Sequence, residues 1–169
     1  MQKPIFYFDK LKTWDKVTII LYVLLSMGLW FYFDNTVSNK IQRNILLGYA
    51  LGTQCFFYFF NYKSLRNLTV YTFWIATGIL HLYLYMQLKD DQSLRNARGL
   101  SAATGLRNTL LLLLLFQILR FLSATTQGKE LVCPSKSKTD LFDERKITLI
   151  DFVLFAVYIG TTIILLVNE

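Results

Sequence analysis

The chain has 169 residues, of which 54% are hydrophobic and 16% aromatic, and its formal net charge is +7. Charged residues make up 17% of the sequence, below the roughly 25% of a typical soluble domain. The deficit is concentrated in five apolar stretches, and the basic residues cluster beside them, a distribution that argues against both a soluble globular domain and nucleic-acid binding. The sequence therefore predicts a single all-α domain over residues 1–169, a polytopic bundle of about five transmembrane helices in contact with the lipid bilayer.

The first apolar stretch is expected to span residues 17–33. Residues 1–16 interleave aromatic side chains with four lysines, a pattern typical of a segment at the membrane interface. No small-x-small cleavage pattern follows the first stretch, so we expect an uncleaved anchor.

The second span is expected at residues 44–62 and the third at 68–88. The second contains Gly48 and Gly52, the GxxxG spacing that lets another helix approach closely. We interpret this pair first as a packing face within the chain and second as a contact between copies. The turn between the two spans is short, so they should be antiparallel neighbours.

The fourth span is expected at residues 103–122 and carries six consecutive leucines between Arg107 and Arg120. On a helix these arginines lie roughly 20 Å apart, whereas the hydrocarbon core is about 30 Å thick. At least one guanidinium group therefore needs a counter-ion or protein cover. A flexible cytoplasmic loop is expected over residues 123–147, before a fifth span at 148–167.

The distribution of basic residues predicts the orientation. Eleven lysines and arginines fall in the N-terminal segment, the 61–67 turn and the 123–147 loop, against five in the other two links. The positive-inside rule then favours a cytoplasmic N-terminus and an exterior C-terminus. Short links and this bias suit a bacterial inner membrane, although a eukaryotic organelle is an open alternative.

Charged residues inside the spans are the first candidate site. Asp151 lies about one turn inside the fifth span, at the depth of Arg120, so we expect these two residues to form an interhelical ion pair. A structural role for the pair is the first interpretation and a proton relay the second. Arg107, at the other end of the fourth span, is expected near Asp90 and Asp91.

Uncharged polar residues inside the spans are the second candidate site. His81, Gln54 and Asn108 are expected to form hydrogen bonds between helices. Together with Arg107 they could instead line a shared hydrated crevice or a pore.

The sequence contains no recognisable catalytic motif or metal-ligand set, and only one histidine. We therefore expect no catalytic residue, cofactor or metal site. The leading hypothesis is a non-enzymatic subunit or accessory component of a membrane assembly or homo-oligomer, with other membrane subunits or itself as partner. The alternative is a small oligomeric channel or transporter, and a membrane enzyme acting on lipid or quinone would lack an acid–base set.

Overall fold

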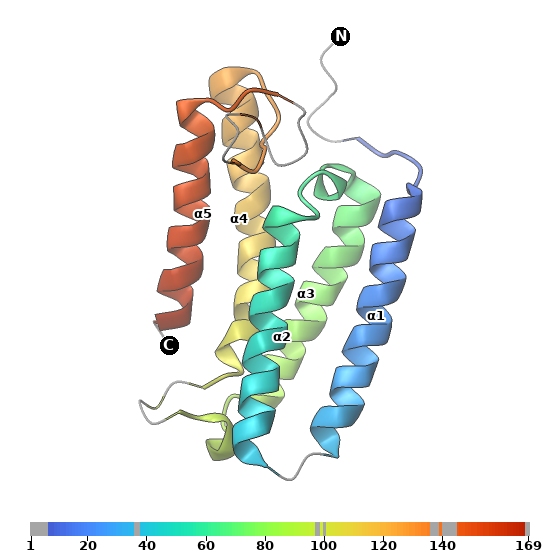
Figure 1. The fold of residues 1–169 in the computed structure, drawn as a ribbon, viewed down its shortest axis with the longest axis vertical. Helices are drawn as coiled ribbons and strands as arrows, with labels where there is room; N and C mark the ends of the chain where they lie inside the picture. The colour runs from blue at the N-terminus through green and yellow to red at the C-terminus, as the bar shows by residue number, and fades with distance from the viewer. Residues whose placement is uncertain are drawn as a thin grey trace.

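The computed structural model describes residues 7–35, 38–96, 99, 101–135, 139 and 145–167. This part of the chain is helical, with two single 3-10 turns, η1 (Ser64–Arg66) and η2 (Gln92–Leu94), between long helices. The long helices are α1 (Thr13–Asp34), α2 (Asn39–Phe59), α3 (Leu68–Leu88), α4 (Thr104–Gln127) and α5 (Leu149–Val167). Consecutive helices run in opposite directions and form an up-and-down bundle (Figure 1). The predicted all-α bundle is confirmed.

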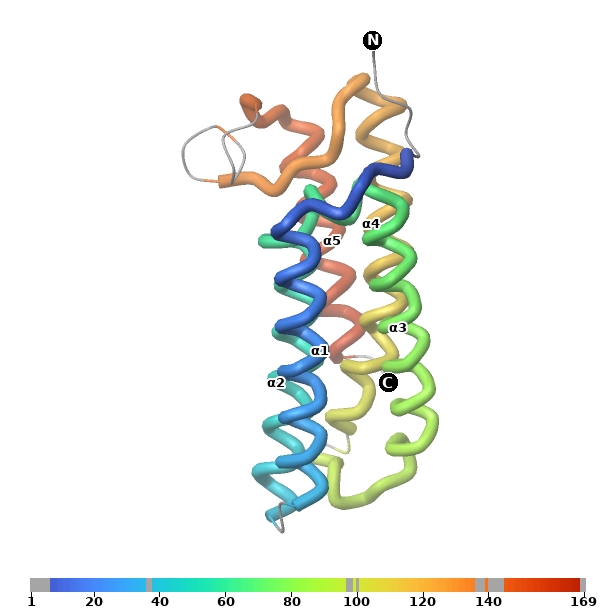
Figure 2. The backbone as a smooth tube through the Cα atoms, turned by 90° about the vertical axis from the view of Figure 1, so that its right-hand side faces the viewer, coloured from blue at the N-terminus to red at the C-terminus, as the bar shows by residue number. Residues whose placement is uncertain are grey.

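Four of the helices, α1, α3, α4 and α5, are long and apolar enough to cross a membrane. The fold is therefore that of a polytopic helical membrane protein. Helix α2 is as long as α3 and runs alongside the other helices in both views (Figures 1 and 2). It is less apolar because its first turns carry several polar side chains, those of Asn39, Lys40, Gln42, Arg43 and Asn44.

Local hydrogen bonds explain where the helices begin and end. The Asn67 side chain accepts from the backbone N–H of Thr69 at 3.1 Å and so caps α3. Thr148 and Asp151 exchange backbone-to-side-chain bonds before α5, as in a capping box. Gly128, with φ of 63°, adopts the left-handed conformation that terminates α4. Helix α4 thus continues beyond its predicted end at residue 122.

Helix α4 is the centre of the bundle and packs against α2, α3 and α5. Two glycines mark close contacts between helices, α2 with α4 and α3 with α4. A Cβ on Gly105 would lie 2.8 Å from the Cβ of Ala50, and one on Gly78 would lie 3.2 Å from the Cα of Leu110. By contrast, only 6% of the 18-residue apolar stretch of α1 is buried, against 39% of that of α4. Helix α1 is therefore a peripheral member.

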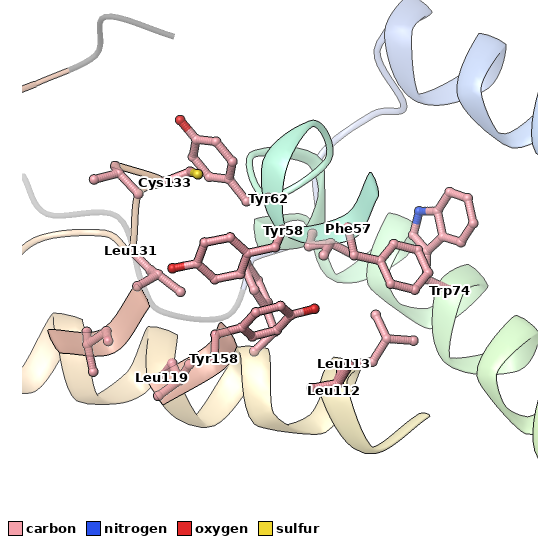
Figure 3. Close-up of a cluster of buried hydrophobic side chains, with 14 of the residues drawn as sticks. Phe57, Tyr58, Tyr62, Trp74, Leu112, Leu113, Leu119, Leu131, Cys133 and Tyr158 are labelled. Atoms are coloured by element: carbon pink, nitrogen blue, oxygen red, sulfur yellow. The ribbon is translucent and has the colours of Figure 1, made fainter. Parts of the chain in front are cut away.

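The largest core cluster joins side chains from α2, α3, α4 and α5 (Figure 3). The Trp74 ring lies edge-on to the Phe57 ring. The ring centroids of Tyr58 and Tyr158 lie 4.2 Å apart. The segment after α4 folds back onto this cluster and buries Leu131, Val132 and Cys133. The first part of the expected flexible loop thus packs against a core cluster that contains aromatic side chains of α2. Residues 123–127 of that loop belong to α4 instead, and residues 136–138 and 140–144 lie outside the described residues.

Candidate functional site

Four helices meet in a polar junction around His81, in the middle of α3. His81 Nε2 lies 2.9 Å from the Tyr49 hydroxyl of α2 and 3.2 Å from the Tyr22 hydroxyl of α1. Its Nδ1 lies 3.2 Å from the Thr109 hydroxyl of α4. Each of these side chains is polar and lies within an apolar helix, so the junction fixes the helices relative to one another.

The contacts of the junction favour one tautomer of His81. Thr109 also lies 3.5 Å from the Gly105 carbonyl, so its oxygen is the natural acceptor for an Nδ1–H of His81. Nε2 of His81 is then an acceptor, and two phenol groups face its one lone pair. The Tyr49 hydroxyl has a second contact with Ser26 Oγ at 2.8 Å. The hydrogen bonds can therefore be arranged in more than one way.

A cavity of about 550 Å³ opens beside this junction, between α1 and the helices α2, α3 and α4. Tyr22, Ser26, Tyr49 and His81 form its polar end. The rest of the lining is apolar except for Thr77 and Asp34, and Asp34, at the end of α1, is the one charged residue among those that line it. The cavity exists because α1 packs loosely against its neighbours.

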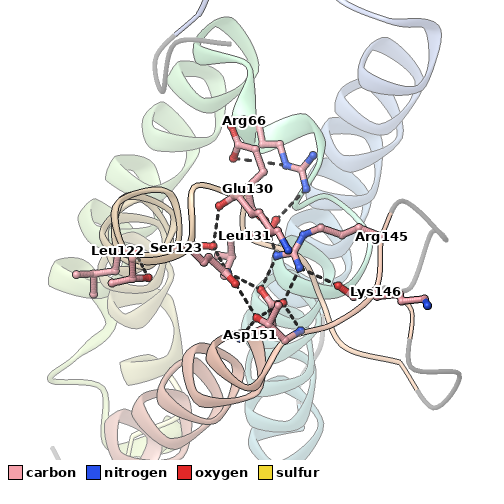
Figure 4. Close-up of polar contacts among 12 residues, drawn as sticks. Arg66, Leu122, Ser123, Glu130, Leu131, Arg145, Lys146 and Asp151 are labelled. Carbon is pink, nitrogen blue, oxygen red and sulfur yellow. Dashed lines mark hydrogen bonds and ion pairs between the residues drawn. The ribbon is translucent and has the colours of Figure 1, made fainter. Parts of the chain in front are cut away.

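A second polar cluster lies at the end of the bundle where α1, α3 and α5 begin (Figure 4). The guanidinium of Arg120 donates to both carboxylate oxygens of Glu130, at 2.8 Å each, and to the backbone carbonyl of Arg66 at 3.2 Å. The ring of Tyr7 lies 5.8 Å from the guanidinium carbon. Burial raises the pKa of the Tyr7 hydroxyl, so this ring stays neutral beside the ion pair.

Asp151 is completely buried in the same region. Arg145 donates to its two carboxylate oxygens at 2.7 and 2.6 Å, and Gln127 donates at 3.0 Å. Arg145 also donates to the backbone carbonyl of Glu130 at 2.9 Å, which links the two ion pairs. The buried carboxylate is thus both neutralised and hydrogen-bonded, as a charge in an apolar region requires.

The predicted ion pair between Arg120 and Asp151 is therefore not formed. Each residue pairs instead with an opposite charge from the segment between α4 and α5, Arg120 with Glu130 and Asp151 with Arg145. Each of these partners is close in sequence to the residue that it neutralises. A direct pair of Arg120 and Asp151 would instead have to bridge α4 and α5. Helices α4 and α5 are still tied here, through Gln127 and Asp151.

The remaining polar candidates form bonds within the bundle. Gln54 donates to the Gly105 carbonyl at 2.8 Å, and Asn108 donates to the Leu165 carbonyl at 2.8 Å. Arg107 donates to the Asn108 side chain and lies over the Tyr85 ring, 5.6 Å from its centroid. The predicted contact of Arg107 with Asp90 and Asp91 gives way to this aromatic contact. His81, Gln54 and Asn108 thus form hydrogen bonds between helices.

Gly48 and Gly52 do not form a packing face within the chain. Both are exposed, and no atom of another residue lies within 4 Å of a Cβ placed on either glycine. The buried side of α2 carries Leu46, Ala50, Thr53, Gln54, Phe57 and Tyr58. The close approach of α2 to α4 uses Ala50 and Gly105 instead, a pair that no motif within one helix could reveal.

Sequence reasoning missed Glu130, Arg145, Tyr22, Tyr49 and Thr109 as members of the polar clusters. Glu130 and Arg145 lie in the segment that was expected to be flexible, where charges carry no periodic signal. The two tyrosines and the threonine match the belt and core residues of any membrane helix. Their one available signal was the presence of an intramembrane histidine that needs several partners.

Comparisons with protein-family models, with curated proteins and with solved structures find no match for this chain. Among the described residues, no group of three or more histidine, cysteine or acidic side chains is placed to hold a metal ion. The class of protein thus follows from the fold, and its function has to be argued from the surfaces and clusters described above.

Proposed function

We propose that this protein is a non-enzymatic integral membrane component that assembles with a second copy of itself through the outward side of α2. We define the α2 face as Asn44, Gly48, Gly52 and Cys55, which recur at helical spacing and are all exposed. This face is the single observation that carries the proposal. It lies on the side of α2 away from the bundle core.

The α2 face differs from the outward sides of the other helices. Lipid-facing surfaces are normally covered by large apolar side chains, and α1, α3 and α5 follow that rule with exposed residues such as Leu24, Ile79 and Val153. The α2 face offers two glycines and an asparagine amide, which favour a second helix over acyl chains. A two-fold axis beside Gly48 and Gly52 would bring the same residues of two copies together.

The alternative is a channel or transporter, but the residues that could line its path are bonded to other protein groups. His81, Gln54, Asn108 and Arg107 each contact protein groups inside the bundle. A hydrated path would have to break the bonds of His81, Gln54 and Asn108, because they join helices that are packed together. A pore between copies would need polar groups on the outer surface, where the α2 face supplies only Asn44.

We further propose a bacterial inner membrane with the N-terminus in the cytoplasm. The start of α1, the η1 turn and the segment after α4 lie at one end of the bundle (Figure 1). That end carries most of the basic residues, and such an excess marks the cytoplasmic side. A reporter that is active only outside the cytoplasm should then be active when fused to residue 169, and a reporter that is active only in the cytoplasm should be inactive there.

The experiment compares the oligomeric state of purified protein in mild detergent with that of a variant. The wild-type chain of 19.8 kDa should elute as a dimer or larger species by light scattering, and Gly48→Leu/Gly52→Leu should be monomeric. Gly28→Leu is the matched control, because Gly28 of α1 is also exposed and has no atom within 4 Å of an added Cβ. A monomeric wild type, or an unchanged double variant, would contradict the proposal.

A further inference from the structure

We propose that the cavity beside α1 binds a neutral, ring-headed, membrane-soluble molecule with a carbonyl or hydroxyl oxygen, of which a quinone is the simplest example. The oxygen would be held by the phenol groups of Tyr22 and Tyr49. This binding site is independent of the α2 face, since Gly48, Gly52 and Cys55 do not line the cavity.

The size and position of the cavity suit a ligand that arrives from the bilayer. Its volume of about 550 Å³ falls within the range of small-molecule sites, about 300–1,000 Å³. It reaches from Asp34, at the end of α1, to Tyr22 and His81 near the middle of the spans. Met27 and Leu80 line it and are 66% and 55% exposed, so its side wall opens toward the lipid-facing surface.

The polar end of the cavity can exchange one of its internal hydrogen bonds for a hydrogen bond to a ligand. Both phenols lie within 3.2 Å of His81 Nε2, but only one can donate to it at a time. Ser26 donates its one hydroxyl proton to the Tyr22 carbonyl, so its oxygen is an acceptor for Tyr49. When Tyr22 donates to His81 instead of to Tyr49, the Tyr49 hydroxyl is able to turn from Ser26 to a ligand oxygen. Such a group is a suitable partner for a carbonyl or a hydroxyl.

The charge of the lining selects a neutral ligand. None of the described residues that line the cavity is a lysine or an arginine, and Asp34 is acidic. A carboxylate or phosphate would therefore enter an apolar space without a counter-ion, which is strongly unfavourable. Fatty acids and anionic phospholipid headgroups are thus excluded from the polar end.

The aromatic side chains of the lining select a flat ring over a plain acyl chain. Tyr22, Trp30, Phe31, Phe33 and Tyr49 all line the cavity, and aromatic groups pack favourably against one another in stacked or edge-on geometry. A straight chain would gain only apolar contact. The combination of aromatic walls and a hydroxyl-rich end points to a ring that carries an oxygen.

The test measures the rise in the unfolding midpoint of detergent-solubilised protein on titration with decylubiquinone, n-decanol or decanoate. A ligand that binds only the folded state stabilises it by RT ln(1 + [L]/Kd), so the midpoint rises with ligand concentration and yields a dissociation constant. We expect such a rise with decylubiquinone, a smaller effect of n-decanol, which has a chain and an oxygen but no ring, and none with decanoate. Equal effects of decylubiquinone and n-decanol would show an ordinary acyl-chain groove and overturn the proposal.

Variants locate the effect. Leu80→Trp and Met27→Trp should each fill the cavity from exposed positions and abolish the rise, whereas Ile164→Trp, exposed on α5, should leave it unchanged. Tyr49→Phe should raise the dissociation constant fitted to the titration about three- to tenfold, the value of one hydrogen bond. A full response in both tryptophan variants of the cavity would overturn the site. The same titration on Gly48→Leu/Gly52→Leu should match the wild type, which separates this test from that of the α2 face.

Discussion

Arg120 of α4 is completely buried, and both oxygens of its counter-ion Glu130 lie 2.8 Å from its guanidinium nitrogens. Glu130 belongs to the segment between α4 and α5, and its side chain is 34% exposed. A charge in the bundle interior is thus neutralised from the bundle end. The segment after α4 is therefore a structural part of the domain.

Replacing Glu130 should release this segment. Glu130→Gln leaves the buried Arg120 without a full counter-charge, and we expect a loss of about 3 kcal/mol in unfolding free energy, at the lower end for a broken buried pair because Glu130 is partly exposed. Cys133 is buried in the same segment and reports on its release. A water-soluble maleimide should label it faster in the variant. Lys129→Gln is the control, and equal labelling in all three proteins would refute the prediction.

A double-mutant cycle should separate the observed ion pairs from the pair that the sequence suggested. Arg145→Met and Asp151→Asn should show a coupling energy of about 1–3 kcal/mol, because their side chains share two short hydrogen bonds. Arg120→Met and Asp151→Asn should be additive to within about 0.5 kcal/mol. The measurement is unfolding in a mild detergent, and a coupled Arg120–Asp151 cycle would reinstate the direct pair.

Two glycine substitutions should have opposite effects on stability. Gly105→Ala places a Cβ 2.8 Å from that of Ala50 and should cost about 1–3 kcal/mol through overpacking. Gly48→Ala meets no atom within 4 Å and should be neutral or stabilising by up to about 1 kcal/mol, since alanine favours the helix. Thermal unfolding at a detergent concentration high enough to dissociate the dimer measures both. Equal costs would show that Gly48 is packed inside the bundle.

Vesicles that contain the protein should conduct ions no faster than empty vesicles. The polar groups that could line a path, His81 among them, are bonded to neighbouring helices. A fluorescence assay of proton and potassium flux tests this expectation, with His81→Phe as the matched variant. Flux that appears with the wild type and disappears with His81→Phe would support the channel instead.

Sequence periodicity and hydropathy predicted the helices well, because burial in lipid leaves a strong local signal. The third helix begins and ends at residues 68 and 88 as expected. The fourth extends further, since Gly128 and not the last leucine terminates it. The first turns of α2 are polar, and α2 is the one predicted span that is not among the four helices apolar enough to cross a membrane.

The site was predicted less well, because its contacts join residues that are distant in sequence. His81 was recognisable as a polar residue within a span, but its partners Tyr22 and Thr109 come from other helices. The counter-ions of Arg120 and Asp151 depend on how the segment between α4 and α5 folds back. The orientation of Gly48 and Gly52 depends on which side of α2 faces the core, and GxxxG spacing alone does not specify it.

Cross-linking at Cys55 is the most direct test of the α2 face. In membranes, a Cys133→Ser variant retains Cys55 alone, three residues from Gly52 on the same side of α2. Mild oxidation should then convert it to a disulfide-linked dimer of about twice the chain mass, in a yield that Gly48→Leu/Gly52→Leu reduces. A cysteine at position 24 of α1, in place of the 60% exposed Leu24 and in a chain with both native cysteines replaced by serine, should remain monomeric. A Cys55 protein that stays monomeric, or one that cross-links no better than the position-24 control, would contradict assembly through the α2 face.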